Sequence, residues 1–345
     1  MKLLIIGGTR FLGRHLVNAA LATGHQVTLF NRGNYSPKFS QTVEEIHGDR
    51  NQDLDRLQGR NWDAVIDTCG ILPRQVKASA EFFAGSVKTY CFVSSQSAYA
   101  DVSNPGVLEN SPLKDLTDEE LEEAYKIDGS TPSASNYGRL YGGLKALSER
   151  AAQEAIPNRT LMIRPGLIVG PFDYTDRFTY WPVRVARGGD VLTPGRPDRH
   201  LQYIDARDLA EWMIKIIEAG ATGVFNASGQ SGSLTMRRLL EACKNVSKSN
   251  ASFTWVSEEF LFRENVVPWS EMPLWLPEEA APYLKGFMFI NSEKAVGSGL
   301  KYRLVTETIH DTLDWFQKER ESTQMQAGIS PQREEMLLRK WHQMN

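Results

Sequence analysis

The first half of the chain alternates short apolar runs with longer segments whose apolar residues recur at helical spacing. The run Leu3–Ile6 contains no polar residue, which is typical of a strand buried on both faces. The segment Phe11–Ala22 that follows it has the spacing of a helix. Further strands are predicted at Gln26–Phe30, Val43–Ile46, Ala64–Ile66, Tyr90–Val93 and Thr160–Ile163, and further helices at Val76–Phe83 and Arg139–Ala155. This alternation predicts an α/β fold with a doubly wound, mainly parallel sheet of the Rossmann type.

Two parts of the chain depart from this alternation. The stretch Asp101–Asn136 is acidic and rich in Ser, Pro and Asp, and we interpret it as a surface insertion with a short helix at Asp118–Tyr125. Beyond Gly170 the pattern loosens, and helices are expected at Arg207–Glu218, Met236–Val246, Val305–Lys318 and Ser330–Trp341. We therefore predict a Rossmann domain over residues 1–170 and a smaller lobe over residues 171–345. Segments of this lobe are expected to return to the sheet. The last helix of the chain is expected to dock against the rest of the protein.

Composition and charge narrow the class of protein. The 345 residues are 41% hydrophobic and 23% charged, which is typical of a packed globular chain. A net charge of -3 gives no overall positive field that would attract nucleic acid or a membrane surface. Neither the three cysteines nor the histidines show metal-binding spacing, so no metal is expected. The first apolar run is too short for a signal peptide, and no segment approaches the roughly 20 apolar residues of a membrane span, so a cytoplasmic protein is expected.

A glycine-rich turn, Gly7–Gly13, joins the first strand to the first helix. Glycine lets the backbone approach a pyrophosphate closely, and the helix that follows offers free N–H groups and the positive end of its dipole. Glycine-rich turns after strands are common, so the prediction depends on the position of this one at the first strand–helix junction of a βαβ unit. We expect a dinucleotide to be bound here by Gly7, Thr9, Arg10, Phe11, Leu12 and Gly13.

The residues after the second strand bear on the choice of cofactor. This strand is followed by Asn31 and Arg32, with no acid that could bind the 2′-hydroxyl of an adenosine ribose. Arg32, together with Arg10, would instead suit a 2′-phosphate, although Arg32 could equally be a solvated loop residue. The pattern favours NADP, with NAD as the alternative. Asp49, after the third strand, is expected either beside the adenine or as the cap of the next turn.

Candidate proton-transfer residues stand at two places. Tyr141 and Lys145 are four residues apart in a predicted helix, and so lie on one face. A free phenol has a pKa of about 10, and a neighbouring ammonium would lower it, making the phenol usable as acid and base. Tyr137 lacks such a lysine. Ser94 and Ser95 end the fifth strand, where ligands of open α/β sheets bind, and Ser95 could donate to a substrate oxygen or merely cap the turn.

In this order along the chain, these segments resemble the extended and atypical short-chain dehydrogenase/reductases, which include NAD(P)-dependent epimerases and dehydratases. The resemblance covers about residues 1–319. It rests on Gly7–Gly13, Ser94-Ser95-x-x-Ala98-Tyr99, Tyr141-x-x-x-Lys145 and Arg164-Pro165-x-x-x-x-Gly170-Pro171. It implies Ser95 as the catalytic hydroxyl, Tyr141 as acid/base, Lys145 as pKa modulator and ribose ligand, Pro165 beside the nicotinamide, and Thr68, Cys69 and Gly70 along the cofactor. It also implies a dinucleotide-binding domain over residues 1–170 and a mainly substrate-binding lobe beyond.

Three departures from the family pattern limit what the resemblance implies, and the last two weaken the case for a nucleotide-sugar substrate. The middle glycine of the turn is Arg10. Leu167 stands where nucleotide-sugar epimerases usually have an asparagine, and Leu201 stands where they have the arginine that binds the substrate diphosphate. These changes leave the predicted hydride chemistry unaffected, but they do affect the predicted substrate class.

The substrate is expected to contact residues that follow Pro171. Arg177, Tyr180, Trp181 and Arg184 would overhang the pocket together with Gln96, unless the aromatic residues belong to the core and the arginines are solvated. We predict reversible hydride transfer to or from a carbinol carbon of a small hydroxylated substrate, with reduction or epimerisation as the outcome. One alternative is a nucleotide-sugar epimerase or dehydratase, and another is a non-catalytic dinucleotide-sensing or RNA-associated protein. A homodimer would fit the resemblance, and neither nucleic acid nor a membrane is expected as a partner.

Overall fold

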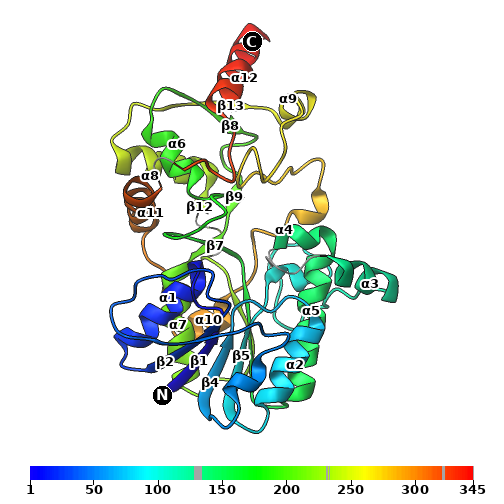
Figure 1. The fold of residues 1–345 in the computed structure, drawn as a ribbon. Coiled ribbons are helices and arrows are strands. Elements are labelled where there is room, and N and C mark those ends of the chain that lie inside the picture. Colours follow the sequence, from blue (N-terminus) through cyan, green and yellow to red (C-terminus); the bar gives the residue numbers. More distant parts are fainter. Residues whose placement is uncertain (128–133, 231, 233, 321–322, 345) are drawn as a thin grey trace.

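A seven-stranded parallel sheet is the main feature of the computed structural model, which describes residues 1–127, 134–230, 232, 234–320 and 323–344 (Figure 1). Its strands lie in the order β11-β6-β5-β4-β1-β2-β3. They are β1 (Lys2–Ile6), β2 (Gln26–Asn31), β3 (Glu44–His47), β4 (Trp62–Asp67), β5 (Val87–Val93), β6 (Thr160–Pro165) and β11 (Gly223–Ala227). The order turns back at β1, which confirms the predicted doubly wound fold and leaves a crevice at the carboxyl ends of β1 and β4.

Both faces of the sheet are covered, which explains the unbroken apolar run of β1. Leu3 and Ile5 belong to a core cluster with residues of α1 (Phe11–Ala22) and α7 (Ala206–Glu218). Leu4 and Ile6 belong to the cluster on the opposite face, with residues of α2 (Pro73–Phe83) and α5 (Tyr141–Ala155). Figure 1 shows the two helix layers on either side of the strands. Because successive side chains of a strand point to opposite faces, every position here must be apolar.

The start of α5 sets the position of the candidate proton-transfer group. A 3₁₀ turn, Gly138–Leu140, precedes α5, so the helix begins at Tyr141 and not at the predicted Arg139. In the region predicted to be an insertion, α3 (Asp118–Lys126) begins after Thr117, whose hydroxyl accepts a hydrogen bond from the N–H of Glu120. A four-residue helix, α4 (Ala134–Tyr137), follows, and residues 128–133 lie outside the described residues.

The chain beyond Gly170 builds a second packed core beyond the carboxyl ends of the strands (Figure 1). Trp181 and Trp275 are fully buried in it. In the described part of the chain, three two-stranded sheets and several helices surround it: β7 (Leu167–Val169), α6 (Tyr180–Ala186), β8 (Asp190–Pro194), β9 (His200–Leu201), β10 (Tyr203–Asp205), β12 (Leu234–Thr235), α8 (Met236–Ser247), β13 (Ser252–Val256), α9 (Glu258–Arg263), α11 (Val305–Glu319) and α12 (Pro331–Met344). From this half of the chain, β11 joins the large sheet, α7 packs on it, and α10 (Glu293–Gly297) packs beside β11.

Candidate active site

A pocket of about 430 Å³ opens at the carboxyl ends of the central strands, above the glycine-rich turn. Gly7 and Gly8 have φ values of +99° and +84°, a region that other residues rarely adopt. A Cβ at Gly13 would lie 2.5 Å from the Cα of Gly8, so α1 can pack on the turn only if residue 13 has no side chain. Arg10 is the N-cap of α1 and makes no capping hydrogen bond with its side chain. The turn therefore offers the first N–H groups of α1 to a ligand.

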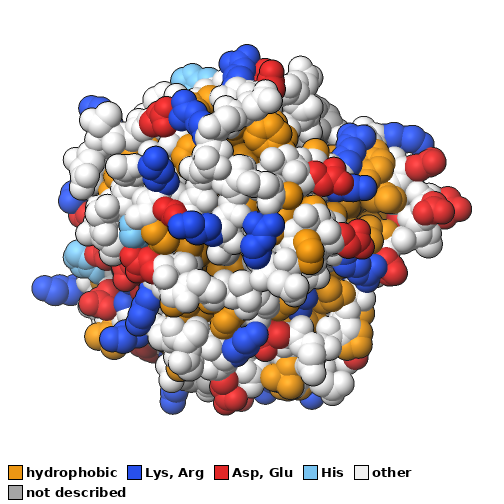
Figure 2. Space-filling view, turned by 90° about the horizontal axis from the view of Figure 1, so that it is seen from below, with side chains coloured by type: hydrophobic (Ala, Val, Ile, Leu, Met, Phe, Trp, Pro, Cys, Tyr) orange, Lys and Arg blue, Asp and Glu red, His pale blue; other side chains and the backbone are white. Residues whose placement is uncertain are grey.

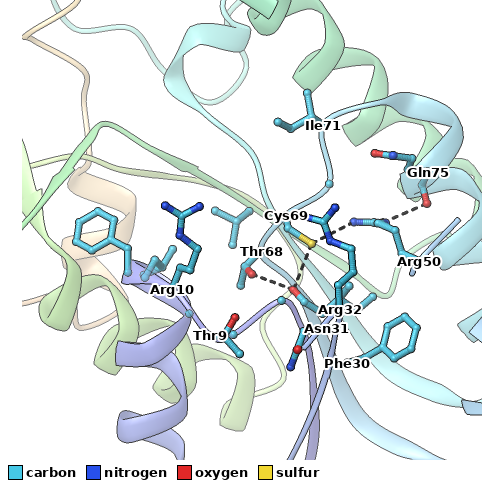
Figure 3. Close-up of a pocket in the computed structure, with 18 of the residues that line it drawn as sticks. Thr9, Arg10, Phe30, Asn31, Arg32, Arg50, Thr68, Cys69, Ile71 and Gln75 are labelled. Carbon is cyan, nitrogen blue, oxygen red and sulfur yellow. Dashed lines mark hydrogen bonds between the residues drawn. The ribbon is translucent and has the colours of Figure 1, made fainter. Parts of the chain in front are cut away.

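The pocket brings together every residue that the sequence assigns to a cofactor or to proton transfer. Figure 3 shows Thr9, Arg10, Asn31, Arg32 and Thr68 around it. Its lining includes Gly7, Thr9, Arg10, Phe11, Leu12, Gly13, Asn31, Arg32, Asp49, Thr68, Cys69, Gly70, Ser94, Ser95, Tyr141, Lys145 and Pro165. Asp49 also makes the turn-capping contact weighed above, because its Oδ1 accepts a hydrogen bond of 2.7 Å from the backbone N–H of Asn51.

Tyr141 and Ser95 face each other at one end of this pocket. Both hydroxyls line the pocket, and the Oγ of Ser95 accepts a hydrogen bond from the N–H of Ser97 at 3.1 Å. Burial raises the pKa of Tyr141 to about 12, and the nearby Ser95 hydroxyl acts in the opposite direction. The phenol of Tyr141 therefore keeps its proton at neutral pH.

Lys145 lies one helical turn beyond Tyr141, but its ammonium is not directed at the phenol. Its Nζ donates to the carbonyl oxygens of Gly70 at 2.8 Å and Val93 at 2.6 Å. Burial lowers the pKa of Lys145 to about 8, against the opposing effect of Asp67. The expectation that this ammonium lowers the pKa of Tyr141 is therefore wrong for this structure. The carbonyls of Gly70, after β4, and of Val93, at the end of β5, hold the ammonium in the lining of the pocket.

An ion pair that the sequence analysis missed lies beneath the pocket. The two Nη atoms of Arg50 donate to the carboxylate of Asp67 at 2.8 and 2.7 Å, and Tyr90 donates to the same carboxylate at 3.0 Å. Figure 3 shows Arg50 reaching toward Cys69 and the backbone of Gln75. Both charged groups are almost fully buried. A signal existed in the sequence, because an acid at the end of a strand that is otherwise apolar requires a buried cation as its partner.

A second buried ion pair fixes the helix that carries Tyr141 and Lys145. Glu149, one turn beyond Lys145, accepts hydrogen bonds from Arg164 Nε at 2.9 Å and Nη2 at 2.6 Å. The Nη1 of Arg164 donates to the hydroxyl of Tyr99 at 3.0 Å. This network joins α5 to β6 and to the loop that follows Ser95, and so holds the three segments of the candidate site in register.

The residues predicted to contact the substrate do not line this pocket. Tyr180 and Trp181 are buried in the second core, where Trp181 Nε1 donates to the carbonyl of Pro273 at 2.9 Å. Arg184 donates to the carboxylate of Glu334 on α12 at 2.6 Å. These placements correct the expectation that the segment overhangs the pocket, because its side chains hold the second core and α12 together. Gln96, also buried, donates to the carbonyl of Phe287 at 3.1 Å, and Arg177 stacks on Trp269.

The described residues also bear on metal binding and on membrane insertion. Among these residues, no group of three or more His, Cys, Asp or Glu side chains is arranged to hold a metal ion. In the same part of the chain, no helix combines the length and the apolar character needed to cross a membrane. The cysteines are free, with Cys91 and Cys243 buried and Cys69 half-buried at the pocket.

The sheet order and the glycine-rich pocket define a Rossmann-type α/β protein with a nucleotide site. The model of the NAD dependent epimerase/dehydratase family matches residues 3–228, and the chain belongs to this family. The chloroplast stem-loop binding protein of 41 kDa b from Arabidopsis thaliana is 28% identical over 262 residues, which cover 70% of this chain and 62% of that protein. The chain thus matches less than two thirds of the length of this relative.

Solved structures agree with the fold. A human epimerase family protein with NADPH has a TM-score of 0.60 at 18% identity and covers 91% of this chain and 99% of its own. UDP-N-acetylglucosamine 4-epimerase from Methanobrevibacter ruminantium, in complex with UDP-N-acetylmuramic acid, has a TM-score of 0.65 at 17% identity, with 92% and 98% covered. UDP-glucuronic acid 4-epimerase from Bacillus cereus, in complex with NAD, has a TM-score of 0.64 at 14% identity, with 92% and 99% covered. At these identities the likeness is one of fold.

Proposed function

We propose that this protein is an NAD(P)-dependent oxidoreductase or epimerase of the short-chain dehydrogenase/reductase type. The observation that carries the proposal is a single pocket that joins the glycine-rich turn to the hydroxyls of Tyr141 and Ser95. A nucleotide diphosphate suits the turn, since Gly7 and Gly8 line the pocket and a Cβ at Gly7 would meet Thr68 Oγ1 at 2.5 Å, so the turn keeps this shape only with glycine there. Family membership and solved relatives that hold NAD or NADPH support this cofactor class.

Each of these pocket residues would have its own role in the reaction. A bound nicotinamide supplies a centre that takes up or gives a hydride at a carbinol carbon of the substrate. During reduction Tyr141 donates its phenolic proton to the substrate oxygen, and during oxidation its phenolate takes up the proton of the substrate hydroxyl. Ser95 orients Tyr141 and donates to the same substrate oxygen. Lys145 binds the ribose next to the nicotinamide and places a positive charge under the pocket floor.

We propose a small hydroxylated substrate rather than a nucleotide sugar. Leu201, at the position where nucleotide-sugar enzymes of this type have a diphosphate-binding arginine, is 2% exposed and packs in the second core. Leu167, at the position of their asparagine, also packs against that core. Neither side chain can replace the polar contacts of those residues.

The position of Arg32 supports NADP as the preferred cofactor. Arg32 follows β2 and lines the pocket, and the neighbouring residues Asn31 and Asn34 are neutral. We expect Arg32→Ala to weaken NADPH binding about 10- to 100-fold, because a charge-assisted contact to the 2′-phosphate is lost. NADH binding should stay nearly unchanged. Titrations of nicotinamide fluorescence measure both, and an equal loss for the two dinucleotides would reverse the stated preference.

A second candidate function is the binding of RNA, which the name of the Arabidopsis relative suggests. The observation that favours it is a set of arginine–aromatic pairs near the pocket, Arg74 on Tyr125 at 4.4 Å and Arg177 on Trp269 at 5.5 Å. Such pairs can stack bases and neutralise phosphates. Figure 2 shows Lys and Arg interspersed with Asp and Glu on the lower face, so that face offers no basic patch. Binding of an RNA hairpin that weakens steeply with salt would support this candidate, and undetectable binding at low salt would remove it.

A further inference from the structure

The guanidinium of Arg10 lies between two tyrosine rings at the pocket. Its Cζ is 3.7 Å from the ring centroid of Tyr174 and 4.8 Å from that of Tyr35. The two rings come from different loops, since Tyr35 follows β2 and Tyr174 follows β7, and all three residues line the pocket. The side chain of Arg10 therefore joins both loops beside the glycine-rich turn.

A guanidinium that packs against aromatic rings keeps the N–H groups at its edge able to donate. Within the part of the chain that the structure describes, Arg10 has no acidic partner and its side chain donates no hydrogen bond. The other arginine deep in the pocket differs, because Arg50 is held by the carboxylate of Asp67. Of these two cations, Arg10 is the one that an incoming anion can use.

The surroundings of Arg10 indicate which anionic group it would meet. Arg10 is the N-cap of α1, so it stands at the helix end that attracts anions. Tyr174 also lies close enough to Tyr141 to raise the pKa of that phenol. The side of Arg10 that contacts Tyr174 therefore faces Tyr141. A 2′-phosphate would instead lie at the end of β2, beside Arg32. The group between the helix end and the nicotinamide is the diphosphate.

The loop that carries Tyr174 is held firmly from behind. Asp176 is fully buried, forms an ion pair with Arg320 at 2.5 Å and accepts the N–H of Gln326 at 2.8 Å. Phe172 and Asp176 have φ values of +70° and +59°, which non-glycine residues keep only where their surroundings enforce them. The backbone that carries Tyr174 is thus held in place, and its ring, which is 38% exposed, packs against Arg10.

We propose that Arg10, oriented by Tyr35 and Tyr174, binds the diphosphate of the dinucleotide and so contacts the part that NAD and NADP share. This inference rests on the proposed function. Where related enzymes have a glycine that lets the backbone approach the diphosphate, this chain supplies a cation fixed between two rings.

The test compares dinucleotide affinities of the full-length chain by nicotinamide fluorescence, with NADPH and NADH as probes. Arg10→Met should weaken both about 10- to 100-fold and to the same degree, because a charge-assisted contact is lost. Arg10→Lys should recover part of that loss, since the charge remains without the planar stacking. Tyr174→Leu should cost about 2- to 10-fold for both dinucleotides, because Arg10 loses one of its stacking partners.

The matched control is Arg14→Met. Arg14 lies one turn further along α1 and stacks on Phe172 at 3.6 Å, but it does not line the pocket, so both affinities should stay at the wild-type values. Thermal unfolding of each variant checks that the fold persists. A loss confined to NADPH would make Arg10 a ligand of the 2′-phosphate and overturn the proposal, as would unchanged binding of both. If the wild-type chain binds neither dinucleotide, the proposed function itself fails.

Discussion

Replacing Tyr141 with phenylalanine should lower turnover about 100- to 10,000-fold, the range typical of losing a general acid or base. The substitution removes the hydroxyl near Ser95 and leaves the ring that lines the pocket. Affinity for NADPH should therefore remain close to that of the wild-type chain. The measurement is NADPH oxidation against a panel of small carbonyl compounds, with cofactor binding followed by fluorescence.

A matched control comes from the same stretch of chain. Tyr137→Phe removes a phenolic hydroxyl four residues earlier, on a side chain that is 3% exposed, belongs to the apolar cluster against which Tyr141 packs, and does not line the pocket. It should keep wild-type turnover. Full activity of Tyr141→Phe, or an equal loss in both variants, would show that the hydroxyl of Tyr141 does not move the substrate proton.

The second large effect concerns the ion pair beneath the pocket. Arg50→Met should lower the free energy of unfolding by about 3–5 kcal/mol, the range seen when one partner of a buried pair is removed. Desolvation alone would raise the pKa of Asp67, and the Arg50 guanidinium holds it below its usual value. Without Arg50, the carboxylate must remain charged without that partner or take up a proton. Chemical denaturation at neutral pH measures the loss.

An exposed ion pair provides the comparison. Arg60 and Glu44 lie 2.8 Å apart with 41% and 50% of their side chains exposed. Arg60→Met should therefore cost less than about 1 kcal/mol, because water screens such pairs. If Arg50→Met costs no more than Arg60→Met, the buried pair does not stabilise the floor of the pocket.

The sheet could be read from the sequence because its signals are local. The run Leu3–Ile6 is apolar at every position since helices cover both faces, and the glycine-rich turn follows it directly. The dinucleotide pocket was predictable for the same reason. Strand ends of a parallel sheet meet at one edge, so residues that follow different strands converge there without further information.

The second core could not be predicted in this way, because its partners are distant in the sequence. The contact that buries Trp181 is with Pro273, 92 residues away, and the partner of Arg184 is Glu334, 150 residues away. An aromatic and basic segment after Pro171 has the same pattern whether it lines a pocket or packs in a core. The three-dimensional structure places its aromatic side chains in the core.

The direction in which the pKa of Tyr141 shifts could not be predicted from the sequence either. Spacing alone places Lys145 one turn away on the same helix face, which suggests a lowered pKa. In the structure the ammonium donates to the carbonyls of Gly70 and Val93, and burial raises the pKa of the phenol to about 12. Helical spacing fixes where the Cβ of a residue lies on the helix, but hydrogen-bond acceptors determine where the charged end of a long side chain lies.

The most direct test of the central claim is an experimental structure of the full-length chain with NADPH bound. We expect the diphosphate on the glycine-rich turn at the start of α1, beside Arg10, and the nicotinamide next to the hydroxyl of Tyr141. A dinucleotide bound away from this turn, or a nicotinamide that does not reach Tyr141, would contradict the account.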